Sequence, residues 1–262
     1  MKRAGFTLAA LLLAASWGRA ALAQSESGQN DANNPLTPKI TFNIHDYYVP
    51  KLTDVPDEDA NQLLFRGLIP HKTFGRGQLL RFTLPLVTTP TASGHATAFG
   101  DLTLMDIIPF KSGKMELGVG PLLVAPIAGK HVTGSGKWQA GAVGLLIAPQ
   151  KWGLIGSLLT YQHSFAGDDD RPETSLMTFQ PLLIYNLPKG FYMRSTGTWT
   201  FDLEKAGDYI PLGLGVGKVW QVGKTTINGF VEPQYSVWTN GAGTPQWQIF
   251  VGLNFQFALA AK

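Results

Sequence analysis

The chain has 262 residues, of which 15% are charged and 44% hydrophobic, with a formal net charge of +3 and no cysteine. A chain without cysteine forms neither a disulfide framework nor a thiolate metal site. Lys2, Arg3 and Arg19 account for the whole net charge, so the chain after residue 23 is formally neutral and lacks the basic surface that nucleic-acid binding needs.

Residues 1–23 have the pattern of a secretory signal peptide. A basic start is followed by an apolar run from Phe6 to Ala15 and by the small-residue sequence Ala21-Leu22-Ala23, which fits a cleavage site. The alternative, an uncleaved membrane anchor, needs about 20 consecutive apolar residues, and this run is shorter. We therefore expect an exported protein.

Residues 24–38 are rich in Ser, Asn, Gly and Pro and offer almost nothing to bury. A segment of this composition cannot offset the entropy lost on ordering. We predict a disordered periplasmic tail here rather than a folded plug, which would need more residues and an apolar core.

From Lys39 to Phe257 the chain consists of apolar/polar alternating segments of about ten residues, separated by turn-rich connections. This rhythm predicts an all-β fold, a transmembrane antiparallel up-and-down β-barrel of about 12 strands over residues 39–257, with a C-terminal extension at 258–262. The expected strands are 39–48, 61–70, 78–86, 99–110, 115–125, 137–148, 152–163, 175–186, 191–201, 208–220, 225–237 and 246–257.

The last segment alternates most clearly. Its apolar face holds Trp247, Ile249, Val251, Leu253, Phe255 and Phe257, and its polar face holds Gln246, Gln248, Gly252, Asn254 and Gln256. Only Phe250 interrupts the polar face. Successive strand side chains point to opposite faces, so we expect one face to meet lipid and the other a polar interior.

The connections between the segments are alternately short and long. The short ones are residues 111–114, 149–151, 187–190 and 221–224. In bacterial outer-membrane barrels the short turns face the periplasm and the long loops face outward. Both chain ends are therefore expected in the periplasm.

A soluble β-sandwich also alternates, with its apolar faces turned to a shared core. The signal peptide, the even number of segments and the aromatic residues near segment ends favour the barrel, because aromatic girdles mark the two membrane interfaces. These aromatic residues are Trp138, Trp152, Tyr161, Tyr185, Tyr192, Tyr209, Trp220, Tyr235 and Trp247.

Some segments break strict alternation. Asp106 falls on the same face as Leu102 and Leu104, which would place a carboxylate in lipid unless a bulge or an interfacial depth intervenes. The segments 137–148 and 152–163 are apolar on both faces, so the sequence leaves their orientation open.

Alternation assigns eight polar residues to the lumen. Two interpretations stay open: these side chains form ion pairs that fill a narrow barrel, or they line a solute path and set its selectivity. Twelve strands lie between the filled eight-stranded barrels and the open porins of about sixteen strands. The lumen-lining candidates are Asn43, His45, Arg66, Arg81, Glu116, Gln180, Arg194 and Glu232.

Two further constellations concern catalysis and metal binding. His163-Ser164 is the nearest approach to a catalytic pair, but neighbours on a strand point to opposite faces, so we expect no catalytic residue and no enzyme. Asp168, Asp169 and Asp170 could hold a divalent cation. A solvated loop tip is the simpler interpretation of these acids, and no cofactor is expected.

Three segments, Asn61-Gln62-Leu63-Leu64-Phe65-Arg66-Gly67-Leu68-Ile69-Pro70, Phe99-Gly100-Asp101-Leu102 and Gly118-Val119-Gly120-Pro121, resemble the bacterial outer-membrane β-barrel family named for the meta-pathway of phenol degradation. The resemblance covers residues 35–257 and implies an outer-membrane transporter, since some members are linked to uptake of aromatic compounds. The closing strand is also similar to the assembly signal of outer-membrane proteins, although five residues follow Phe257.

We therefore expect a passive channel or transporter for small solutes, hydrophobic or aromatic ones among them. The alternative is a structural or envelope-interaction barrel with a plugged lumen, and the third hypothesis is a lipid-modifying outer-membrane enzyme. The expected partners are outer-membrane lipid and lipopolysaccharide, the barrel assembly machinery and a small-molecule solute, with no nucleic acid.

Overall fold

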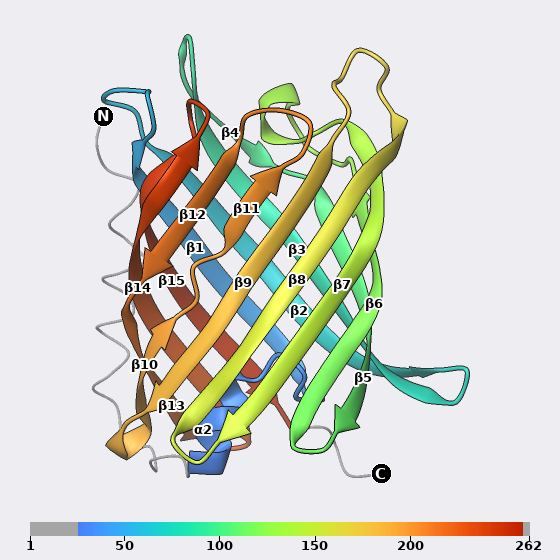
Figure 1. Ribbon diagram of the computed structural model, residues 1–262, viewed down its shortest axis with the longest axis vertical. Coiled ribbons are helices and arrows are strands. Elements are labelled where there is room, and N and C mark those ends of the chain that lie inside the picture. Colours follow the sequence, from blue (N-terminus) through green and yellow to red (C-terminus); the bar gives the residue numbers. More distant parts are fainter. Residues whose placement is uncertain (1–25, 259–262) are drawn as a thin grey trace.

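The computed structural model describes residues 26–258 of the chain. The predicted signal peptide at 1–23 lies outside the described residues, as does most of the C-terminal extension. The described chain forms a closed barrel of antiparallel strands (Figure 1). The prediction of a 12-stranded antiparallel β-barrel is confirmed.

Twelve barrel strands arise from fifteen β segments, because three barrel strands are each split into two. The split pairs are β4 with β5, β10 with β11, and β12 with β13. The segments are β1 Ile40–Leu52, β2 Ala60–Thr73, β3 Arg76–Thr91, β4 Gly94–Phe99, β5 Leu102–Ser112, β6 Met115–Ala125, β7 Lys137–Gln150, β8 Gly153–Gly167, β9 Ser175–Asn186, β10 Phe191–Ser195, β11 Trp199–Asp202, β12 Asp208–Gly213, β13 Gly215–Val222, β14 Thr225–Asn240 and β15 Pro245–Phe257. The helical elements are α2 Glu26–Asn33, η2 His131–Thr133 and η3 Pro188–Gly190.

The barrel closes where the first strand meets the last. β1 pairs antiparallel with β15 in a register that runs from Ile40 opposite Phe257 to Tyr48 opposite Ile249. Closure removes the unpaired backbone edges that an open sheet would present. A closed ladder is also the condition for a sheet to exist in a lipid environment.

The two ends of the barrel differ, as the connection lengths predict. Tight turns after β2, β5, β7 and β13, together with η3, lie at one end, which we call the short-turn end. The described chain also begins and ends there, with α2 at the bottom of the barrel in Figure 1. The opposite, long-loop end carries the connection 126–136 with η2 and a tall β3–β4 hairpin. No helix among residues 26–258 is long and apolar enough to cross a membrane.

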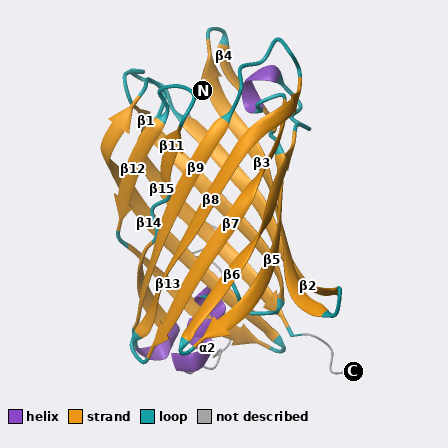
Figure 2. Ribbon diagram, turned by 45° about the vertical axis from the view of Figure 1, so that its right-hand side comes forward, coloured by secondary structure: helices purple, strands orange, loops and turns teal. Residues whose placement is uncertain are grey.

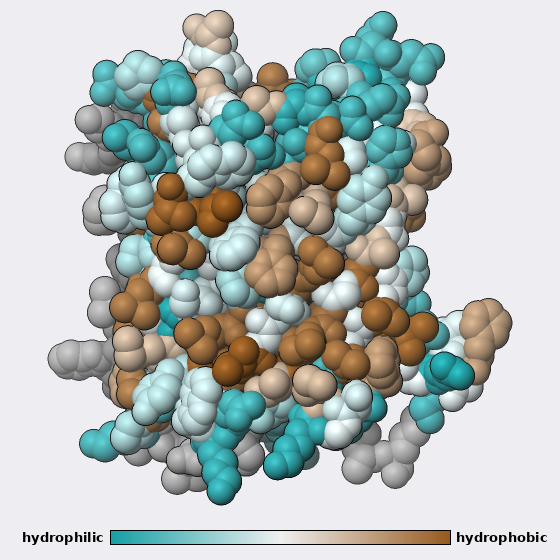
Figure 3. Space-filling view, in the orientation of Figure 1, coloured by the Kyte–Doolittle hydropathy of each residue, from teal (hydrophilic) through white to brown (hydrophobic). Residues whose placement is uncertain are grey.

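The side of the barrel seen in Figure 3 is apolar across its middle and polar at both ends. Six of the aromatic residues predicted near strand ends are exposed on the outer surface of the barrel: Trp138, Trp152, Tyr161, Tyr185, Tyr235 and Trp247. The prediction is wrong for Tyr192, which is fully buried inside the barrel. It is also wrong for Tyr209, which shares the inner face of β12 with Gly213.

Asp106 points outward, yet it is not isolated. It pairs in register with Leu80 of β3, on the face opposite to inward-facing Arg81. His71 Nε2 lies 2.9 Å from its carboxylate, and the Gln78 amide can donate to the same group at 2.7 Å. These partners lie beside the β2–β3 hairpin, which flares from the short-turn end in Figure 2 with Phe74 at its tip. Local hydrogen bonds near the end of the barrel, and no bulge, therefore accommodate Asp106.

The prediction of a disordered tail is wrong for residues 26–38. α2 occupies the short-turn end of the barrel (Figure 2), and we call residues 26–37 the plug. Gln29 Nε2 donates to the carbonyls of Leu187 and Phe191, while Asn30 Nδ2 donates to the carbonyl of Gln150. The Asn and Gln residues that suggested disorder instead satisfy backbone groups at the ends of strands, where no ladder partner is left.

The plug also buries two apolar side chains, Ala32 and Leu36, in the floor of the barrel. They join a cluster of inward side chains from β5, β7, β8 and β9: Ile107, Leu145, Ile147, Leu154 and Ile184. This contact explains why the segments 137–148 and 152–163 are apolar on both faces. Their outer face meets the surroundings, and the inner face at this level meets the plug instead of water.

Gly217 provides a test of packing inside the wall. A Cβ at this position would lie 2.2 Å from Cζ of Tyr192, whose hydroxyl donates to Asn228 Oδ1 at 2.5 Å. Overpacking of a filled interior typically costs about 1–3 kcal/mol. We expect Gly217→Ala to lower the free energy of unfolding by about 1–3 kcal/mol, measured by urea titration of the refolded barrel in detergent.

Gly144→Ala on β7 is the matched control, because nothing lies within 4 Å of its Cβ position. A Gly217→Ala variant as stable as Gly144→Ala would contradict the packing described around Tyr192.

Candidate functional site

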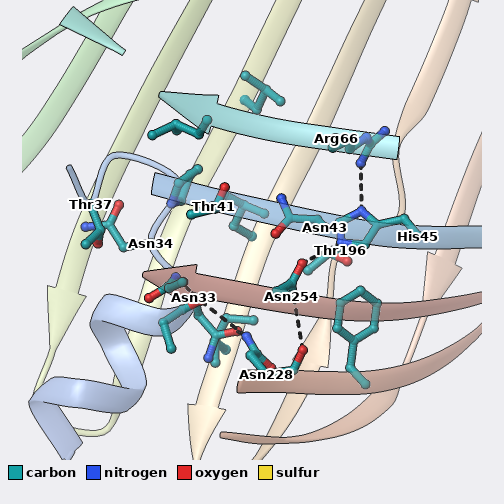
Figure 4. A pocket seen from close by; sticks show the side chains of 18 of the residues that line it. Asn33, Asn34, Thr37, Thr41, Asn43, His45, Arg66, Thr196, Asn228 and Asn254 are labelled. Carbon is teal, nitrogen blue, oxygen red and sulfur yellow. Dashed lines mark hydrogen bonds between the residues drawn. The ribbon is translucent and has the colours of Figure 1, made fainter. Parts of the chain in front are cut away.

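The inner wall encloses a space between the plug and the middle of the barrel. Its volume is about 940 Å³, including the part that opens to solvent. Its floor is formed by five plug residues: Ala32, Asn33, Asn34, Pro35 and Thr37. Its walls are formed by inward side chains of β1, β2, β3, β8, β9, β10, β14 and β15 (Figure 4). We call this space the lumen pocket.

An aromatic layer bounds the lumen pocket on the side away from the plug. His45, Tyr47, Phe230 and Phe250 project inward from β1, β14 and β15. Phe250 stacks on Tyr47 with ring centroids 4.1 Å apart and meets Phe230 edge-on at 4.8 Å. Phe250 is the one residue that interrupts the polar face of its strand, and its burial in this aromatic layer explains the interruption.

A buried ion pair adjoins the aromatic layer. Arg194 Nε lies 2.8 Å from Glu232 Oε2, and its guanidinium carbon lies 3.4 Å above the centre of the Phe230 ring. The Glu232 side chain is completely buried. It also accepts hydrogen bonds from the backbone nitrogen and hydroxyl of Thr196, both at 2.7 Å, and from Gln234 at 3.0 Å.

The ion pair coincides with the interruption between β10 and β11. Thr196 follows directly after β10, and its N–H donates to Glu232 rather than to a neighbouring strand. Gly213 of β12 faces the Glu232 carboxylate and Gly215 of β13 faces the base of the Glu232 side chain, and at each position a Cβ would come within 2.6 Å of a Glu232 atom. Glycine at both positions leaves room for the buried side chain.

The opposite wall of the lumen pocket is basic. Arg66 on β2 and Arg81 on β3 both face the pocket. Arg66 Nη1 lies 3.1 Å from His45 Nδ1, and His45 Nε2 lies 2.7 Å from Asn254 Oδ1. His45 thus links the basic wall to the amides of β15 (Figure 4).

Amide side chains form the lower wall and hold the plug. Asn228 Nδ2 donates to the Ala32 carbonyl at 3.2 Å and to Asn33 Oδ1 at 3.0 Å. Gln256 Nε2 donates to the Ala32 carbonyl at 3.1 Å. Asn33 and Asn228 face each other in Figure 4. The plug is therefore attached to the wall by hydrogen bonds as well as by the apolar contacts of Ala32 and Leu36.

The structure brings six of the eight lumen candidates to the lumen pocket: Asn43, His45, Arg66, Arg81, Gln180 and Arg194. Glu232 lies behind Arg194 and does not line the pocket. Glu116 lies near the floor and accepts a hydrogen bond from Asn34 at 2.7 Å.

Sequence reasoning missed several contributors to this site, among them Phe230 and Thr196. Phe230 was not selected because an apolar residue on a polar face carries no signal of its own. Thr196 was missed because it lies at a strand interruption that alternation does not reveal.

The loop candidates lie apart from the lumen pocket. Asp168, Asp169 and Asp170 fall in the β8–β9 connection, where the Asp170 backbone N–H donates to Asp168 Oδ1. Among residues 26–258, no three His, Cys, Asp or Glu side chains gather closely enough to hold a metal ion.

Ser164 is buried and donates to Glu173, while half-exposed His163 on the opposite face of the strand lies 4.0 Å from Glu204. The hydrogen bond from Ser164, and then the charge of Lys137, hold the pKa of the Glu173 carboxyl below its usual value. Lys137 Nζ lies 3.5 Å from this carboxylate. These contacts tie β7, β8 and the β8–β9 connection together at the long-loop end.

Together the fold and the pocket define a class of protein: a closed 12-stranded barrel with a polar interior, of the architecture seen in bacterial outer-membrane proteins. No protein-family model matches the chain, and no curated protein matches it. Among solved structures it is similar to an outer membrane channel from Pseudomonas putida F1, with a TM-score of 0.61 and 14% identity over 87% of this chain and 98% of that one.

Two further solved structures match the chain with lower TM-scores. The KdgM porin has a TM-score of 0.46 with 11% identity, over 84% of this chain and 99% of that one. The β domain of the Bordetella autotransporter BrkA has a TM-score of 0.40 with 12% identity, over 84% of this chain and 100% of that one.

Proposed function

We propose that this protein is a passive channel of the bacterial outer membrane for small solutes, hydrophobic or aromatic ones among them, and that it is not an enzyme. The observation that carries the proposal is the lumen pocket, a space inside the closed barrel that measures about 940 Å³ when the part open to solvent is included. A barrel with a purely structural role has no need of such a space, because small barrels are filled by their own side chains.

Three further features support an outer-membrane location. The outer face is apolar across its middle, with exposed aromatic residues near the strand ends. The first 23 residues have the pattern of a cleaved signal peptide. The segments at 61–70, 99–102 and 118–121 resemble the outer-membrane family named for the meta-pathway of phenol degradation. In this orientation the short-turn end faces the periplasm and the long-loop end faces outward.

The test is solute entry into liposomes that contain the refolded protein. We expect small neutral solutes to enter faster than into protein-free liposomes, with a rate that falls as solute size rises. The matched control is the same protein left unfolded, identified by its failure to shift in gel migration on heating. Equal swelling rates with folded and unfolded protein would contradict the channel proposal.

A second candidate function, a structural barrel with a plugged lumen, rests on the plug itself. The side chains of Gln29, Asn30, Asn33 and Asn34 all hydrogen-bond directly to strands or turns of the wall at the short-turn end. A plug that never leaves would close the lumen pocket at the short-turn end, so that solute could not pass through the barrel. The two candidates differ in one observable, the passage of solute through a folded barrel.

A further inference from the structure

The charge around the lumen pocket is unbalanced. Among the described residues that line it are Arg66, Arg81 and Arg194, and none is an aspartate or glutamate. Arg194 is neutralised from behind by Glu232. The two arginines of the basic wall have no such counterpart.

Neither Arg66 nor Arg81 has an anionic partner in the described chain. Arg66 contacts uncharged groups, His45 Nδ1 and the Tyr47 hydroxyl, and its Nε atom is buried without any hydrogen-bond partner. Arg81 forms no hydrogen bond and no ion pair with any residue between 26 and 258.

Arg66 and Arg81 are neighbours on the inner face of β2 and β3. Leu68 pairs in register with Arg81 and Arg66 pairs with Thr83, so the two arginines are diagonal neighbours on adjacent strands. Diagonal side chains of this kind lie about 7–8 Å apart at the backbone, within reach of long side chains. Like charges so placed repel each other, and withdrawal from bulk water adds to that cost. An anion bound between the two arginines would reduce both the repulsion and the desolvation cost.

The rest of the lumen pocket has apolar side chains that suit the hydrocarbon part of an organic anion. Leu158 and Leu182 project from β8 and β9, and Phe230 and Phe250 close the far side. Guanidinium groups bind carboxylates through paired, charge-assisted hydrogen bonds. Apolar and aromatic walls favour a hydrocarbon portion over a fully hydrated ion.

We propose that Arg66 and Arg81 form a binding site for a small organic carboxylate, with its apolar portion held against Leu158, Leu182 and Phe230. The proposal deepens the proposed channel function, on which it rests for the route that brings the ligand to the site. Binding and passage are nevertheless separate properties, so each is measured by itself.

The test is equilibrium binding of three probes to the refolded full-length mature protein in a neutral detergent at pH 7, by isothermal titration calorimetry. Benzoate carries a carboxylate and an apolar ring, benzamide is its neutral isostere, and acetate has the carboxylate without the ring. We expect benzoate to bind at least about tenfold more tightly than benzamide or acetate. Benzamide lacks the charged carboxylate that the arginines bind, and acetate lacks the apolar ring.

Arg81→Gln is the decisive variant, with Arg66→Gln as a second. We expect each to weaken benzoate binding at least about tenfold and Arg81→Lys to restore part of it. Arg76→Gln, at the exposed β2–β3 turn, removes the same charge outside the barrel and should bind benzoate as the unchanged protein does. Since Arg81 forms no hydrogen bond or ion pair within the described part of the chain, its replacement should leave the heat-shifted gel migration of the folded barrel intact.

Equal affinity for benzoate and benzamide, or unchanged benzoate affinity in Arg81→Gln, would overturn the site. Absence of benzoate binding to the folded unchanged protein would overturn it as well. A barrel that binds benzoate but passes no solute would keep the site and remove the channel. A barrel that passes solutes without binding benzoate would do the reverse.

Discussion

Glu232→Gln is expected to lower the free energy of unfolding by about 3–5 kcal/mol, because removing one partner of a buried ion pair leaves the other charge without compensation. The side chain of Arg194 is 8% exposed and that of Glu232 is 0% exposed. The amide would also leave the backbone N–H and the hydroxyl of Thr196 with a poorer acceptor. Urea unfolding of the refolded barrel, followed by tryptophan fluorescence, measures the loss.

Glu116→Gln is the matched control for this substitution. Glu116 also faces the interior, but it accepts its hydrogen bond from the neutral amide of Asn34. Loss of its charge therefore leaves no buried cation without a counter-charge. We expect its effect to remain below about 1.5 kcal/mol, the usual contribution of one hydrogen bond. Similar losses for Glu116→Gln and Glu232→Gln would show that the ion pair at the strand interruption contributes no more to the free energy of unfolding than a single hydrogen bond does.

Fixing the plug to the wall is expected to reduce the mean current through the barrel about tenfold or more, since a tether removes the population of states in which the plug has moved. The side chains of Asn30 and Asn186 meet at 2.9 Å, and the chain has no cysteine of its own. The variant Asn30→Cys/Asn186→Cys, joined by a short reducible thiol crosslinker, therefore carries a single tether between α2 and β9. Reduction of the linker should restore the current.

Asn30→Cys alone, treated with the same crosslinker, is the control for modification without tethering. It should conduct as the reduced double variant does. If the tethered and the reduced protein conduct equally, the plug does not limit passage and the path runs beside it.

The strands could be predicted from the sequence because their signal is local. Alternation along β14 and β15 follows directly from a polar inner face and an apolar outer face. The twelve expected segments each coincide with a barrel strand, whole or split. The lengths of the strands were predicted less well. β1 continues to Leu52 and β3 to Thr91, because hydrogen-bonded pairing extends past the residues that alternate clearly between apolar and polar.

The plug could not be predicted from its own residues. Glutamine and asparagine in α2 favour disorder until the acceptors they meet, such as the Leu187 and Gln150 carbonyls, are in place. The signal that could have revealed it lay elsewhere, in the apolar inner faces of β7 and β8. Inward leucine and isoleucine at Leu145 and Ile147 require an apolar partner inside the barrel, and Leu36 provides it.

The sequence predicts which residues belong to the site, but it does not predict which of their charges form ion pairs. Alternation selects the residues that face inward, and six of the eight lie around one space. Which charges neutralise each other depends on distances between strands far apart in sequence. Arg194 meets Glu232 across the β10–β11 interruption, while Arg66 and Arg81 meet no acid, and neither fact can be derived from period-two alternation.

The most direct test of the account is the conductance of a planar bilayer containing the mature protein, refolded in detergent and first shown by heat-shifted gel migration to be a folded barrel. The account predicts small stepwise openings, because the lumen pocket is open space and the plug is attached by hydrogen bonds that can be exchanged with water. Silence from a bilayer that contains the folded barrel would contradict the channel and favour the permanently plugged structural protein.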